Sequence, residues 1–167
     1  YQKNLDRWQM MNDVCSGSRA IKSQGYAYLP LNCDCDDSVG KNRYQSYLQR
    51  AVFYPVTKDT LQNNVGLAFS EDPTFEPDGM DFLKANADGS GTSIYQLNQK
   101  ALDLLLRHGR CGYFVDHPPV VGGVSKTDVD QGIRPTISLY DALQIINWRV
   151  KKVGGVFKTS LIVLFEQ

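Results

Sequence analysis

DGSGTSIYQLNQKALDLLLRHGRCGYFVDHP, residues 88–118, contains a complete helix with a signal at each end, followed at once by a strand. Ser93 and Gln96 have the spacing of a capping box, in which each side chain bonds the other residue's backbone N–H. Gly109 can adopt the left-handed conformation that ends a helix, and the two residues before it are basic, which suits the negative end of the helix dipole. The sequence therefore predicts a helix over residues 94–108.

Apolar residues inside this helix recur at steps of three and four, which places them on one face. They are Ile94, Leu97, Ala101, Leu104 and Leu105. After the glycine, residues 111–115 are β-prone, and Pro118 and Pro119 stop the run because proline cannot donate to a β-ladder. This stretch is interpreted as a helix with one core face, a glycine corner and a short strand.

The residues before this stretch are predicted to be mainly helical. The expected helices run from Leu5 to Cys15, between Asn4 as a cap and Gly17; from Asn42 to a stop before Pro55; over 58–65, between Thr57 as a cap and Gly66; and over 80–85. A loop rich in Gly, Asn, Asp and Ser is expected over residues 23–42, and an exposed loop over 70–79.

The residues after it are predicted to form a small sheet. Residues 120–135, VVGGVSKTDVDQGIRP, read as a long irregular segment of the length usually kept for a functional or disordered region. Strands are expected around Ile137 and Leu139, from Ile145 to Val150, and over 156–165 after a Gly154-Gly155 turn. The predicted fold is α+β, a single domain over residues 1–167 with N-terminal helices followed by a small, mainly antiparallel sheet.

Charge and composition argue against some classes of partner. Lys plus Arg equals Asp plus Glu at 18 each, so no global field attracts nucleic acid or an anionic membrane. The longest apolar run, 161–165, is far shorter than the ~20 residues of a membrane span. Four cysteines at positions 15, 33, 35 and 111 do not form a dense disulfide pattern, so free thiols in a soluble protein are expected.

Cys111 lies near His108, Asp116 and His117, the residue types of a cysteine nucleophile and its base. Strand alternation sends Cys111, Tyr113 and Val115 to the same face, against a packed layer, where burial raises a thiol pKa and lowers reactivity. No catalytic residue is therefore assigned. A cysteine-dependent hydrolase remains the less favoured alternative, and it would predict thiol labelling at neutral pH.

Three patterns resemble ligand sites without completing them. Residues 86–97 imitate a calcium loop, but Leu97 occupies the position of the bidentate Glu. Cys33 and Cys35 lack the second ligand pair of a zinc site. The glycines around Ser90 lack the lysine and the preceding strand of a phosphate-binding loop. No metal and no cofactor is expected.

Short segments along the whole chain resemble, in order, a family of tailed-bacteriophage portal-like proteins long catalogued as a domain of unknown function. The matching segments are Trp8 with Asp13-Val14 and Gly17; Gly25-Tyr26 through Tyr28-Leu29-Pro30; Tyr44 with Tyr47-Leu48 and 50–53; Thr60-Leu61 with Val65-Gly66, Phe69 and Pro73; 88–93; 109–112; Val115-Asp116 with Pro118; Arg134-Pro135; and 145–149. His117 and Cys111 depart from the pattern, because a Tyr and a small residue are more usual at these positions.

The resemblance implies a non-enzymatic structural subunit of a ring, usually a dodecamer, at one vertex of the virion capsid. The ring is assembled in the host cytoplasm, passes double-stranded DNA during packaging and ejection, and docks the terminase, the capsid protein and tail or adaptor proteins. Family members are considerably longer, so this chain is expected to be the N-terminal, wing-like part of a portal subunit.

Ring formation requires two different interface patches on each subunit. Tyr28 and Phe75 are the candidate interface residues, because aromatic anchors are enriched at interfaces. Trp8 and Phe69 are further aromatic candidates, and burial within the subunit is favoured for both. The alternative to a portal is a phage-encoded, non-enzymatic binding module that forms no ring and binds its partner through residues 120–135.

Overall fold

The structure, a computed structural model, describes residues 1–31, 38–76, 78–119, 125, 127 and 132–166. Its elements in chain order are α1 (Gln2–Ser16), α2 (Ser18–Ser23), the 3-10 helix η1 (Gly25–Ala27), α3 (Ser38–Arg50), α4 (Val56–Ala68), the 3-10 helix η2 (Asp81–Lys84), α5 (Ile94–His108), β1 (Gly112–Asp116), β2 (Thr136–Tyr140), β3 (Ile145–Val153) and β4 (Val156–Leu164). Helices precede strands, so the predicted α+β class is confirmed.

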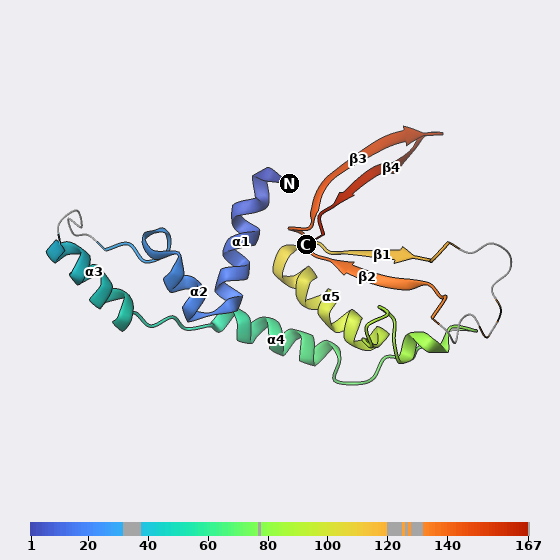
Figure 1. The fold of residues 1–167 in the computed structure, drawn as a ribbon, viewed down its shortest axis with the longest axis horizontal. Coiled ribbons are helices and arrows are strands. Elements are labelled where there is room, and N and C mark those ends of the chain that lie inside the picture. The colour runs from blue at the N-terminus through green and yellow to red at the C-terminus, as the bar shows by residue number, and fades with distance from the viewer. Residues whose placement is uncertain (32–37, 77, 120–124, 126, 128–131, 167) are drawn as a thin grey trace.

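The helices and strands form an extended body rather than a closed sandwich (Figure 1). Helix α4 packs against α1 and α5, and α1 packs against α5. The β1–β2 pair lies along α5, the β3–β4 hairpin rises away from that pair, and α3 lies at the opposite end of the molecule. The core helices therefore carry two projections, one helical and one β.

Helix α5 has the ends that its sequence predicts. The Ser93 hydroxyl accepts from the Gln96 N–H, and the Gln96 side chain accepts from the Ser93 N–H, both at 3.2 Å. At the other end, Gly109 has φ 73°, and its N–H donates to the carbonyl of Leu105 at 2.8 Å. Both predicted helix signals are confirmed, because they depend only on residues close in sequence.

The core lies where α5 and η2 meet the β1–β2 pair. Its buried residues are Leu83, Ala87, Ile94 and Leu97, and the partly buried side chains packed against them are Phe75, Phe82, Tyr95, Ile137 and Leu139. Leu97 is only 3% exposed. The predicted apolar face of α5 is therefore buried in the core along the N-terminal half of that helix.

The four strands form two separate antiparallel pairs, β1–β2 and β3–β4, rather than one sheet. The turn between them explains the separation. The Asp141 carboxylate accepts from the N–H groups of Leu143 and Gln144, each at 2.8 Å, and this tight turn directs β3 away from β2.

The β3–β4 hairpin is fixed to the body only at its base. The Phe165 N–H donates to the Gln144 carbonyl at 2.8 Å. The Arg110 guanidinium lies over two indole rings, 5.2 Å from the centroid of Trp8 and 4.5 Å from that of Trp148. This arrangement joins α1, the end of α5 and the start of β3 through cation–π contacts.

Several predicted helix boundaries are wrong. Asn4 does not cap α1, because its N–H donates to the Tyr1 carbonyl at 3.0 Å from within the helix. Thr57 does not cap α4, which begins after Pro55 and includes Thr57 in its first turn. The helix also runs through Gly66 to Ala68, since packing against α5 offsets the modest cost of one glycine. Helix α3 begins at Ser38, before the predicted start at Asn42, and ends at Arg50, before the predicted end at Pro55.

Two predicted features cannot be compared with the structure. Cys33 and Cys35 lie outside the described residues, as do residues 120–124, 126 and 128–131 of the predicted irregular segment.

Candidate subunit interface

Tyr28, the first predicted interface residue, is partly buried directly after η1. Its hydroxyl donates to the Asp13 carboxylate on α1 at 2.9 Å. Burial raises the pKa of the Tyr28 phenol, and the bond to Asp13 raises that pKa further. The ring is thus held against α1 and retains some exposed surface, so its role in an interface stays a prediction.

Phe75, the second predicted interface residue, is also partly buried. Its ring meets that of Tyr95 edge-on, with centroids 6.5 Å apart and an interplanar angle of 81°. Because Phe75 packs against the core, it anchors the loop between α4 and η2 while the neighbouring residues of that loop stay exposed. Its own interface role stays a prediction.

Trp8 is buried within its own subunit, as was favoured from the sequence, with 6% of its surface exposed. Its indole N–H donates to the carbonyl of His108 at 2.9 Å. That carbonyl belongs to the last turn of α5, where backbone acceptors lack partners within the helix. Trp8 therefore closes the C-terminal end of α5.

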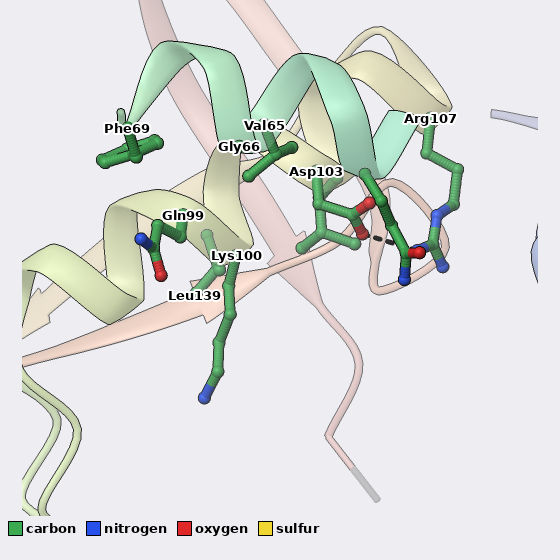
Figure 2. A pocket seen from close by; sticks show the side chains of 10 residues that line it. Val65, Gly66, Phe69, Gln99, Lys100, Asp103, Arg107 and Leu139 are labelled. Atoms are coloured by element: carbon green, nitrogen blue, oxygen red, sulfur yellow. Dashed lines mark hydrogen bonds and ion pairs between the residues drawn. The ribbon is translucent and has the colours of Figure 1, made fainter. Parts of the chain in front are cut away.

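Phe69, which is partly exposed, lies at one end of an open groove of about 700 Å³ between α4 and α5 (Figure 2). Val65 lies between Phe69 and the Asp103–Arg107 ion pair at the other end. A Cβ at Gly66 would meet no atom within 4 Å, so the glycine leaves this wall of the groove open. Sequence reasoning missed the groove because it ended the helix at Gly66.

Cys111 lies on the α5 side of β1. Its thiol is 3.6 Å from the Ala101 carbonyl, and the Tyr113 hydroxyl donates to the Asn98 side chain at 2.7 Å. The shared face predicted for Cys111 and Tyr113 is therefore confirmed, but the packed layer predicted over it is incomplete, because Tyr113 is 49% and Val115 62% exposed. Burial raises the pKa of the Cys111 thiol, which lowers its thiolate fraction at neutral pH.

The two histidines bond to groups other than Cys111. The buried His108 ring places Nε2 2.9 Å from the Asn12 side-chain oxygen, and the His117 ring bonds the Pro118 carbonyl at 2.7 Å. Burial lowers the pKa of His108 from its ordinary 6.5. The other ring nitrogen of His108 is buried and has no partner among the described residues, so protonation would add a donor with nothing to receive it.

We expect acid to destabilise the fold in part through His108. Because its pKa is lower in the folded state, the unfolded chain binds the proton more readily, and stability is lost as pH falls below about 6.5. Urea unfolding at about pH 7.5 and about pH 5.5 would measure the loss. His108→Gln should reduce the difference between the free energies of unfolding measured at the two pH values. His117→Gln, at an exposed site, should leave that difference unchanged. An equal pH dependence in His108→Gln would contradict this role.

The loop that imitates a calcium site has its oxygens occupied by backbone donors. The Asp88 carboxylate accepts from the N–H groups of Ser90 at 2.8 Å and Thr92 at 3.0 Å, and the Asn86 side chain accepts from Gly91 at 3.0 Å. The bonds with Thr92 lower the pKa of Asp88. These contacts order the entry into α5, and the described residues contain no cluster of three metal-ligating side chains.

The predicted β3–β4 hairpin is present, but sequence reasoning overlooked its exposure and its local charge. All residues from Asn147 to Ile162 are exposed. Residues 145–165 contain four basic side chains, Arg149, Lys151, Lys152 and Lys158, and no acidic one. Large apolar side chains accompany them, including Phe157 at 73% and Val156 at 60% exposure. This local excess of positive charge can be counted in the sequence, but the sequence analysis considered only the total charge, which is balanced.

Within the described residues, no helix is both long and apolar enough to cross a membrane. The sequence matches no family model and no curated protein.

Proposed function

We propose that this chain is a structural, non-enzymatic subunit of a portal-like ring at a bacteriophage capsid vertex. The ordered series of sequence segments that resembles the portal-like family supports this proposal. In such an assembly the chain contributes to the peripheral, wing-like region, and its partners are further copies of itself, the capsid protein, terminase, tail or adaptor proteins and the double-stranded DNA in the channel.

The observation that favours an assembly protein is the uncovered β3–β4 hairpin. Each strand has nine residues and one open edge, and exposed apolar side chains lie on both faces. A lone two-stranded hairpin is marginally stable in water, and an open, apolar edge strand pairs readily with other chains. A hairpin of this kind is best explained by burial against another protein surface.

The mass of the native assembly tests the proposal. Mass photometry of the full-length product of the gene that encodes this chain should give one large species of dodecamer size. A product that stays monomeric or dimeric at micromolar concentration would contradict a ring and favour the binding module. In that case pull-down with the hairpin intact and deleted would identify whether the hairpin binds the partner.

A further inference from the structure

We propose that the β3–β4 hairpin of one subunit docks on the acidic loop between α4 and η2 of a second copy of this chain. This inference rests on the proposed function, because it specifies which two surfaces meet between neighbouring copies. It depends on the composition of the hairpin, on the composition of the loop and on the distance between them within one chain.

One face of the hairpin, the basic face, combines cations with apolar side chains. Its residues are Arg149, Lys151 and Val153 from β3 and Val156, Lys158 and Leu161 from β4. Their common orientation follows from alternation along β3 and from the pairing of Arg149 with Leu161, Lys151 with Lys158 and Val153 with Val156. The three apolar members are between 41% and 60% exposed.

The pairing of two lysines points to an anionic partner. Lys151 and Lys158 lie directly opposite each other, and like charges at such positions destabilise an antiparallel pair. Neither lysine has an ion-pair partner within the described part of the chain. Carboxylates brought against this face would relieve the repulsion while the valines and the leucine are buried.

The same chain carries a surface with the required character. The acidic loop contains four carboxylates, Glu71, Asp72, Glu76 and Asp78, and no Lys or Arg between residues 70 and 80. All four are exposed and make no salt bridge to a described residue. Met80, 44% exposed, adds an apolar contact. Phe75 fixes the loop by packing against the core, so less entropy is lost when a partner binds.

The two surfaces cannot meet within one molecule. The acidic loop follows α4 along one side of the body, and the hairpin rises from the opposite side, beyond α5 and the β1–β2 pair (Figure 1). When the hairpin of each copy faces one neighbour and its acidic loop faces another, the interface is heterologous and produces a ring if the rotation closes. Charge complementarity therefore favours a second copy as the occupant of the hairpin.

Duplex DNA is the competing anionic partner for the hairpin. Phosphate contacts are made mostly by basic and small polar side chains, whereas half of the basic face is Val or Leu. A protein surface with carboxylates beside apolar groups matches this mixture better than a phosphate backbone does.

Charge reversal in two separate variants tests the contact. Lys151→Glu/Lys158→Glu reverses the charge of the basic face, and Glu71→Lys/Asp72→Lys/Glu76→Lys reverses that of the loop. Each variant alone would bring like charges together, and we expect the concentration for half-assembly to rise at least about tenfold. Mixing the two variants in equal amounts should restore assembly, because each hairpin then meets a loop of opposite charge. All the changed residues are exposed, and circular dichroism melting would verify that both variants fold.

The possible outcomes distinguish a failure of the proposed contact from a failure of the proposed ring. Wild-type protein that never self-associates overturns both the ring and the contact. Rings that form normally from each variant alone overturn the contact and leave the ring standing. Loss of duplex-DNA binding in the hairpin variant, with assembly unchanged, would assign the basic face to DNA and overturn the contact. Restoration on mixing, with neither variant assembling alone, supports the contact.

Discussion

Replacing Trp8 with alanine is expected to destabilise the folded chain by about 3–5 kcal/mol, the usual cost of truncating a buried aromatic residue. Three contacts are lost together. The indole fills the junction of α1 and α5, its N–H donates to the His108 carbonyl at the end of α5, and its ring lies 5.2 Å from the Arg110 guanidinium. The truncation leaves a cavity and a buried helix-end carbonyl without its donor.

Urea unfolding followed by far-UV circular dichroism measures this loss. Trp8→Phe separates the loss of packing from the loss of the hydrogen bond, because it keeps most of the ring volume and removes the N–H. It should cost about 1 kcal/mol for the hydrogen bond alone. Trp148→Ala is the matched control, since Trp148 contacts the same arginine but is 37% exposed. Equal destabilisation by Trp8→Ala and Trp148→Ala would contradict the central position of Trp8.

Replacing Leu97 with alanine is expected to cost about 2–5 kcal/mol, because the deleted atoms leave a cavity in the core. Leu97 is 3% exposed and lies with Leu83, Ala87 and Ile94 in the main buried cluster. Leu and Ala have similar helix propensities, so the substitution leaves α5 intact as a helix and reports mainly on packing.

Leu105→Ala is the control on the same helix. Leu105 is 46% exposed, so its truncation should change the free energy of unfolding by about 0.5 kcal/mol or less. The comparison also corrects the sequence analysis, which placed Leu105 on the core face with Leu97. If the two substitutions proved equally destabilising, either Leu105 would be covered by a partner or the core would lie elsewhere on α5.

The parts of the fold that the sequence predicts are those fixed by neighbouring residues. The cap at Ser93, the left-handed Gly109 and the Gly154-Gly155 turn each follow from the chemistry of a few consecutive positions, and all are present. Gly66 gave a wrong helix end because one glycine inside a helix costs only about 1 kcal/mol relative to alanine, which the rest of α4 offsets. No local signal distinguishes a glycine that ends a helix from one that lies inside it.

The candidate interface was harder to predict because it depends on how distant segments are arranged. Tyr28 and Phe75 were chosen as aromatic residues in loops, and the structure places each ring partly against its own subunit. The basic face requires the pairing of Lys151 with Lys158, which appears only when the hairpin register is known. Its separation from the acidic loop is a property of the whole fold.

The most direct test of the ring is its rotational symmetry. Electron microscopy of the full-length gene product, isolated at micromolar concentration, should show closed rings with a central channel, and class averages should have a single rotational order. Open filaments, irregular aggregates or isolated particles under the same conditions would contradict a closed ring of identical subunits.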